Sequence, residues 1–216
     1  IASPKIEVIK NGVDLTRFTP VGKDEKLIEE LGLIGKKVIG YIGTHGMAHK
    51  LDFILQCAAN MDGKNNYHFL LIGAGAEKKN LLKLKEQLNI KNVTMLDPIS
   101  KQDVKRYISI LDIALINLRK SDLFTTVIPS KIFENAGMEI PILMGVDGEA
   151  RQILESYQAG LFFEPESEED FNRKLHLLLS DPTLYKQCQE GCRKLAHDFD
   201  RKLLAKRMLH IIKETI

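Results

Sequence analysis

The sequence predicts an α/β fold built on a doubly wound, Rossmann-like parallel sheet. Short apolar runs alternate with amphipathic stretches along most of the 216-residue chain. This alternation is typical of parallel strands joined by right-handed helical crossovers. Glycine loops or proline turns follow several of the apolar runs. Because ligands of such sheets bind at the carboxyl ends of the strands, we expect a ligand site where these loops meet.

Seven apolar runs are predicted to be strands, and the amphipathic stretches to be helices. The expected strands are Ile6–Ile9, Lys37–Ile42, His68–Ile72, Val93–Leu96, Ile113–Ile116, Ile142–Met144 and Leu161–Phe163. The expected helices are Asp24–Leu31, Leu51–Met61, Glu77–Leu88, Lys101–Ile110, Ser130–Ala136 and Glu149–Glu155. Apolar strands of this kind indicate a sheet that is buried on both faces.

Residues 167–216 change character and are predicted to form a helical tail. The expected helices are Ser167–Leu179, Pro182–Ala196 and Asp200–Thr215. The last helix carries a basic face and an apolar stripe, which consists of Leu204, Met208, Ile211 and Ile212. We expect the stripe to face the core, and contact with a membrane surface is the alternative.

The composition excludes several classes of protein. Lysine and arginine number 31 against 29 aspartates and glutamates, and a net charge of +2 gives no electrostatic case for nucleic-acid binding. No apolar run approaches the roughly 20 residues that span a bilayer, and we expect no signal peptide. Three cysteines are an odd, sparse set, which argues against a disulfide framework and for a reducing compartment.

The segment from Thr125 to Gly145 is the most informative part of the chain. Pro129 suits the first turn of a helix, so the free amides of Ser130 and Lys131 are expected to point out of a helix N-terminus. Such amides favour an anion, and the lysine adds a full positive charge. Glu134 follows one turn later and can accept hydrogen bonds from a pair of sugar hydroxyls. The segment therefore indicates a nucleotide-sugar site, and an ordinary helix cap with a surface Lys–Glu pair is the alternative.

Two glycine loops follow predicted strands. In the first, Gly43, Thr44, His45 and Gly46 suit close backbone approach to a phosphate or a sugar. The histidine at 45 can carry a proton or donate a hydrogen bond, as can the one at 49. A metal site is not expected, because no metal-binding glutamate pattern accompanies the histidines.

The second loop, Gly73-Ala74-Gly75, resembles the start of a dinucleotide fingerprint. Lys78 occupies the position of the third glycine, so the fingerprint is incomplete. The alternative interpretation is that the edge of a nucleoside lies against the backbone at Gly75. A third loop contains Pro98 and Ile99, with Ser100 as the expected cap of the next helix. Its backbone can meet a base edge, or it is a plain turn.

Taken in order, these motifs resemble the C-terminal, donor-binding domain of a GT-B glycosyltransferase of family 4 (group 1). The resemblance covers essentially the whole chain. It rests on IEVIKNGVDLTRFTP, YIGTHG with Asp52, LIGAG, NVTMLDPIS, DIALINL, PSKIFENAGMEIPIL and the closing helices. The IPSKIFE and GVDGEA segments are similar to bacterial O-antigen and capsule transferases of the N-acetylfucosamine type.

The resemblance implies retaining transfer of an N-acetylated hexosamine or 6-deoxyhexosamine from a UDP-sugar to a glycan or lipid-linked acceptor. No metal ion and no other cofactor is expected. Glu134 matches the second glutamate of the family's E-x7-E motif, which binds the donor ribose. The amides near Ser130 and Lys131 are expected to hold the pyrophosphate. The Pro98–Ile99 loop is expected to meet the base, with Gly75 nearby.

The resemblance also implies a particular organisation. Residues 1–216 are expected to be one nucleotide-sugar-binding domain of a two-domain, cytoplasmic hexosyltransferase that can touch the inner membrane peripherally. The chain begins without an initiator methionine, and its N-terminal acceptor domain is expected to be missing. The isolated chain is therefore expected to bind donor without turnover.

Three positions depart from the family pattern. Thr126 stands where the first glutamate of E-x7-E is expected, Thr44 replaces a common arginine, and His49 replaces a common lysine. Two common phosphate-binding cations are thus missing, and we expect Lys131 or His45 to substitute for them.

Three other functions stay open at this point. A GT-B sugar-nucleotide epimerase shares the fold and the ligand, but needs acid and base carboxylates between two domains. An NAD-dependent oxidoreductase is disfavoured because Lys78 breaks the glycine fingerprint. A non-catalytic nucleotide-binding domain is the third possibility.

Overall fold

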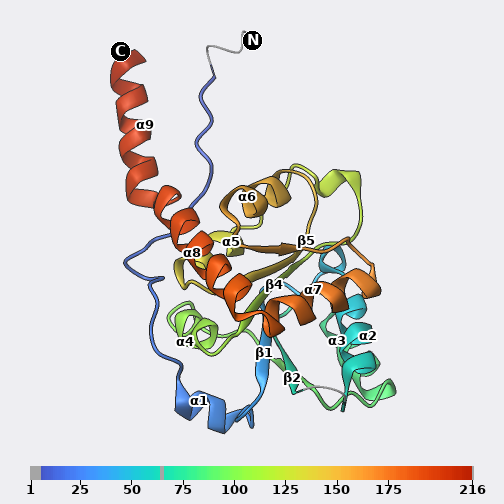
Figure 1. Ribbon diagram of the computed structural model, residues 1–216. Helices are drawn as coiled ribbons and strands as arrows, with labels where there is room; N and C mark the ends of the chain where they lie inside the picture. The colour runs from blue at the N-terminus through green and yellow to red at the C-terminus, as the bar shows by residue number, and fades with distance from the viewer. Residues whose placement is uncertain (1–5, 64–65, 216) are drawn as a thin grey trace.

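The computed structural model describes residues 6–63 and 66–215, and within them the chain forms a six-stranded parallel sheet with helices on both faces (Figure 1). The strands are β1 (Lys37–Ile42), β2 (Tyr67–Ile72), β3 (Val93–Leu96), β4 (Ile113–Asn117), β5 (Ile142–Gly145) and β6 (Gly160–Phe162). Their order across the sheet is β3-β2-β1-β4-β5-β6. This doubly wound, Rossmann-like architecture confirms the predicted fold class.

The helices follow the predicted alternation, with boundaries that shift by a residue or two at most ends. They are α1 (Glu25–Glu30), α2 (Leu51–Met61), α3 (Lys78–Gln87), α4 (Val104–Ser109), α5 (Lys131–Gly137), α6 (Glu149–Tyr157), α7 (Glu168–Ser180), α8 (Pro182–Asp198) and α9 (Arg201–Thr215). Two short 3-10 turns, η2 (Met47–His49) and η3 (Asp122–Phe124), lie in the loops after β1 and β4.

The strand order creates a switch point between β1 and β4. From β1 the chain builds outward through β2 and β3 on one side, and then returns to build β4, β5 and β6 on the other. The carboxyl ends lie in register, since Ile42 pairs with Ile72, and Ile72 pairs with Leu96. The loops that leave these ends diverge at the switch point, which is where sheets of this class bind ligands.

Two apolar clusters hold the layers together, one on each face of the sheet. Alternate residues along β1 divide between them, because Val38 joins one cluster while Ile39 and Tyr41 join the other. Helices α1, α4, α5 and α6 pack on the first face, and α2, α3 and α7 on the second. Burial on both faces explains why the strands read as continuous apolar runs.

Two sequence predictions are wrong, one about a strand and one about where a helix begins. Ile6–Ile9 is not a strand, and its Ile6 and Val8 side chains are exposed because this segment does not join the sheet. The helix predicted from Lys101 begins only at Val104. Ser100 is not the N-cap of this helix, which is Asp103. The Ser100 hydroxyl instead accepts the Asp103 amide at 3.2 Å within the turns that residues 101–103 form before the helix.

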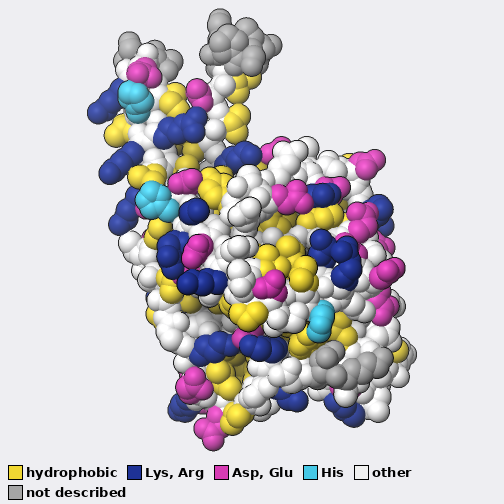
Figure 2. Space-filling model, in the orientation of Figure 1, with side chains coloured by type: hydrophobic (Ala, Val, Ile, Leu, Met, Phe, Trp, Pro, Cys, Tyr) yellow, Lys and Arg dark blue, Asp and Glu magenta, His cyan; other side chains and the backbone are white. Residues whose placement is uncertain are grey.

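The expectation that the apolar stripe of α9 faces the core is also wrong. Figure 1 shows α9 projecting from the body beside the N-terminal segment, and an Arg207–Glu7 ion pair of 3.3 Å joins the two. Met208 and Ile212 are about half exposed. Hydrophobic and basic side chains both lie on this projection in Figure 2. The base of the helix packs closely, with Leu204 against Gly12.

Candidate functional site

The two glycine loops pack directly against each other at the carboxyl ends of β1 and β2. A Cβ atom on Gly73 would lie 1.8 Å from the Gly43 carbonyl oxygen, and one on Gly75 would lie 2.4 Å from the His45 carbonyl oxygen. Such distances leave no room for any side chain, so glycine permits the close approach. The glycines therefore allow the two loops to pack backbone against backbone.

Backbone hydrogen bonds join these loops into one unit. The Gly43 amide donates to the Ile72 carbonyl at 2.9 Å. The His45 amide donates to Ala74 at 2.8 Å, and the His45 carbonyl accepts from the Glu77 amide at 2.9 Å. Because each loop satisfies polar groups of the other, the arrangement is preorganised.

Lys131 reaches from the first turn of α5 to the end of β1. Its Nζ lies 3.9 Å from the centroid of the Tyr41 ring and against Gly43, whose added Cβ would be 2.5 Å away. The Tyr41 hydroxyl fixes the ring by donating to the Thr44 carbonyl at 2.8 Å. No acidic side chain in the described part of the chain forms an ion pair with this ammonium. Burial lowers the pKa of Lys131 to about 8, although Glu134 opposes the shift.

Glu134 follows one helical turn later and is half-buried. Burial raises the pKa of this carboxyl, while Arg201, Lys131 and Arg17 oppose the shift. Neither arginine forms a salt bridge with it, because both donate to backbone carbonyls elsewhere. The turn thus carries a half-buried carboxylate and a half-buried ammonium, and neither is paired among the described residues. Burying unpaired charges costs folding free energy, and a ligand that pairs with them would offset this cost.

The loop before α5 places the other predicted residues of this segment. Ser130 is the N-cap residue of α5 and is exposed, and its amide and that of Lys131 bond to no described residue. Thr126 is exposed as well. The threonine before it is held in place, because its carbonyl accepts the Glu149 amide at 2.8 Å.

The two histidines lie on the inner side of the first loop. The His45 ring is fully enclosed, and neither of its nitrogens makes a well-formed hydrogen bond within the described residues. Burial lowers its pKa to about 4, Lys78 and Lys131 act in the same direction, and the Ile72 backbone opposes them. His49 is half-buried, and burial followed by Lys131 lowers its pKa. Of the two expected substitute cations, His45 is fully buried whereas Lys131 is only partly buried.

The remaining predicted residues lie around the same strand ends. Gly46 precedes η2 and lines a depression of about 320 Å³ beside α2 and α3. Gly75 and Pro98 are exposed after the neighbouring strands β2 and β3, and Ile99 is half-buried. The predicted residues thus come together along the carboxyl edge of β1–β3 and the start of α5.

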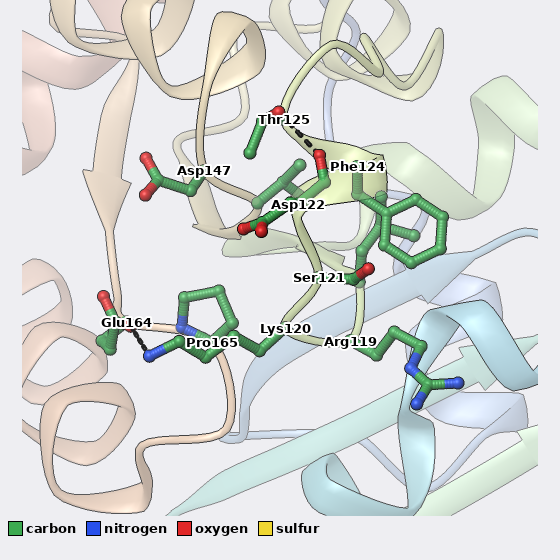
Figure 3. A pocket seen from close by; sticks show the side chains of 11 residues that line it. Arg119, Lys120, Ser121, Asp122, Phe124, Thr125, Asp147, Glu164 and Pro165 are labelled. Atoms are coloured by element: carbon green, nitrogen blue, oxygen red, sulfur yellow. Dashed lines mark hydrogen bonds and ion pairs between the residues drawn. The ribbon is translucent and has the colours of Figure 1, made fainter.

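A small cavity lies apart from Lys131 and Glu134. It has a volume of about 80 Å³ and is formed by the loops after β4, β5 and β6 (Figure 3). Lys120 and Glu164 close one side through an ion pair of 2.6 Å. None of the residues predicted from the sequence lines it.

Two residues near the site were not predicted as part of it. Tyr41 supplies the ring under Lys131, and Lys78 ties the ends of β2 and β3 together. Tyr41 lies inside the YIGTHG motif, which is a signal that sequence reasoning could have used. Within the described residues, no three His, Cys, Asp or Glu side chains are grouped closely enough to hold a metal ion.

A family model described as "Glycosyl transferases group 1" matches residues 23–195. Among curated proteins, the chain is 27% identical over 141 residues to TuaH of Bacillus subtilis (strain 168), whose name links it to teichuronic acid biosynthesis as a glycosyltransferase. The match covers 64% of this chain and 34% of TuaH.

Solved structures share the fold at low sequence identity. Anabaena Alr3699/HepE, crystallised with UDP, superposes with a TM-score of 0.84 at 16% identity, over 96% of this chain and 57% of HepE. A glycosyltransferase from Rickettsia africae ESF-5 gives a TM-score of 0.80 at 20% identity, over 99% of this chain and 58% of that one. The chain therefore spans little more than half of these structures and about a third of TuaH.

Proposed function

Because this chain belongs to the group 1 glycosyl transferase family, we propose that it is the donor-binding domain of a retaining glycosyltransferase that uses a UDP-sugar. Its parallel sheet with flanking helices is the Rossmann-like half-domain of the GT-B architecture. The proposed donor sugar is an N-acetylated hexosamine or 6-deoxyhexosamine. The proposed acceptor is a glycan or lipid-linked glycan of a bacterial surface polysaccharide.

The observation that carries this proposal is the unpaired Lys131–Glu134 turn beside the end of β1. The ammonium lies over the strand-end glycine loop, where a diphosphate would meet backbone amides as well. The carboxylate, one turn along, can accept hydrogen bonds from the two ribose hydroxyls. Charge that develops on the leaving diphosphate would be stabilised by groups that are already in place.

The choice of UDP is supported by the printed description of HepE, which contains UDP. The link to surface polysaccharide is supported by the name of TuaH. HepE is also described in complex with UDP-glucose, which is not an amino sugar. The amino-sugar assignment therefore rests on the IPSKIFE and GVDGEA segments alone.

We further propose that an N-terminal acceptor domain completes the enzyme, which needs no metal ion and works at the cytoplasmic face of the inner membrane. The proposal of a further domain is supported because this chain spans little more than half of the similar structures. The chain alone would then bind donor without turnover. Among the residues that the structure describes, no helix has the length and apolar character to cross a membrane.

The direct test is calorimetric titration of this chain with UDP and, in separate titrations, with GDP, ADP and NAD. We expect UDP to bind at least about tenfold more tightly than the others, a difference of about 1.4 kcal/mol. Tighter binding of NAD would favour an oxidoreductase instead. If no nucleotide binds, the proposal for this chain is wrong.

The affinity for UDP should fall as the pH rises through about 8. The pKa of Lys131 is lowered to about 8 in the free protein, and a bound diphosphate would raise it again because it favours the charged form. The complex therefore holds more protons than the free protein above pH 8, so alkaline conditions weaken binding. Titrations from pH 7 to 9.5 in buffers of different ionisation enthalpy would measure this proton uptake.

In the Lys131→Met variant, the part of the pH dependence that comes from this amine should disappear. A wild-type affinity that stays constant to pH 9.5 would exclude a direct contact between the Lys131 ammonium and the diphosphate.

A further inference from the structure

Lys78 is a mostly buried ammonium that binds two strand ends at once. Its Nζ donates to the Gly73 carbonyl at 3.0 Å and to the Leu96 carbonyl. It also lies 3.8 Å from Asp97 Oδ1, although its own side chain is only 13% exposed while that of Asp97 is 93% exposed. Burial lowers its pKa, and Asp97 opposes the shift. The ammonium is thus directed into the protein and not toward an outside anion.

The two carbonyls belong to the carboxyl ends of neighbouring strands. Gly73 follows β2 and opens the loop that contains Gly75, while Leu96 ends β3 and precedes Pro98 and Ile99. The Gly73 amide also donates to the Leu96 carbonyl, at 3.2 Å. Lys78 therefore adds a charge-assisted contact at the carboxyl end of the β2–β3 ladder, just beyond the pair Ile72 and Leu96.

The β3–α4 loop lies toward the Glu134 side of the proposed site. Arg17, whose charge acts on Glu134, donates from Nη2 to the Lys101 carbonyl at 3.1 Å. A nucleotide with its diphosphate at Lys131 and its ribose at Glu134 would then extend its base toward the β2 and β3 ends. The exposed backbone available there is that of Gly75 and Pro98.

We propose that Lys78 is a positioning residue for nucleobase recognition, because it fixes the loops at Gly75 and at Pro98–Ile99 at the separation that accepts the edge of a base. This inference rests on the proposed function of the same site. The third glycine of a dinucleotide fingerprint would occupy this position, and it has no side chain that could join the two strand ends. The inference therefore gives a role to the residue that departs from the fingerprint.

The test compares a ligand that has a base with one that has none. The Kd values of UDP and inorganic pyrophosphate are measured for the wild type, for Lys78→Met and for Lys78→Gln. Lys78→Met should bind UDP about tenfold more weakly and pyrophosphate within about twofold of the wild type, as expected when one charge-assisted contact is lost. Lys78→Gln keeps the N–H donors of an amide without the charge, and its affinity for UDP should lie between those of the wild type and Lys78→Met.

Lys79→Met is the matched control, because Lys79 is an exposed lysine next to Lys78 on the same helix. It should bind both ligands as the wild type does. The ratio of the Kd values of GDP and ADP to that of UDP should also decrease in Lys78→Met and stay unchanged in the control. A general loss of structure would weaken both ligands together, so circular dichroism and the pyrophosphate value separate folding from positioning.

Equal weakening of UDP and pyrophosphate, or no weakening of either, would overturn the role of Lys78 and leave the nucleotide site in place. A wild-type chain that binds pyrophosphate but not UDP would overturn both the proposed function and this inference.

Discussion

Lys131→Met should weaken UDP binding by about 100-fold, or about 2.7 kcal/mol. The ammonium is half-buried, lies 3.9 Å from the Tyr41 ring centroid and has no ion-pair partner among the described acidic side chains. A diphosphate would therefore supply its first full counter-charge, in a place where water screens the interaction poorly. Calorimetric titration with UDP measures the loss.

The same substitution should not destabilise the fold. Because burial lowers the pKa of Lys131, the folded state holds this charge at a cost, and removing the charge should maintain or raise the free energy of unfolding at pH 7. Urea denaturation checks this. Lys120→Met is the matched control, since Lys120 is exposed and paired with Glu164, and its effect on the Kd should stay within about twofold. Similar losses in both variants would show that the effect is only one of net charge.

Most of the fold could be predicted because local and long-range signals agree. Strand β3 and helix α2 begin and end where the sequence predicts. In β1, burial on both faces requires an unbroken apolar run, and the glycine at position 43 marks its end. Where a turn residue follows an apolar run, the end of the strand can be predicted from sequence alone.

The predictions that failed concern segments whose partners the pattern does not identify. Ile6–Ile9 has a strand-like composition, but it does not join the sheet and runs beside α9 instead. The stripe on α9 is helical in period, yet periodicity cannot say whether a face meets the core of the same chain. Both errors arise because a hydrophobic pattern identifies the apolar face of an element but does not identify the element that packs on it.

In the site too, local features could be predicted from the sequence, whereas tertiary contacts could not. Lys131 and Glu134 could be found because three residues of spacing on a helix place them on one side. The position of the ammonium over Tyr41 depends on how α5 crosses the end of β1, which is a tertiary feature. Lys78 was interpreted as a broken fingerprint, because the carbonyls that it joins are 5 and 18 residues away in sequence.

Glu134→Ala should remove the preference of this chain for ribonucleotides over deoxyribonucleotides. We expect the wild type to bind UDP about tenfold more tightly than 2′-deoxy-UDP, because the carboxylate accepts a hydrogen bond from the 2′-hydroxyl. In the variant, the affinity for UDP should fall to that for 2′-deoxy-UDP, and the latter should change less. Glu134→Gln keeps one acceptor without the charge and should show an intermediate ratio.

The ratio of the two ligands isolates the ribose contact from the rest of the site. Loss of the negative charge at Glu134 also removes repulsion of the diphosphate, so the affinity for both nucleotides can gain a common factor that cancels in the ratio. Asp122→Ala is the control, because its exposed carboxylate, in the loop that leads to α5, forms no salt bridge with a described residue. If Glu134→Ala and Asp122→Ala change the ratio equally, the acidic side chain of α5 is not the ribose ligand.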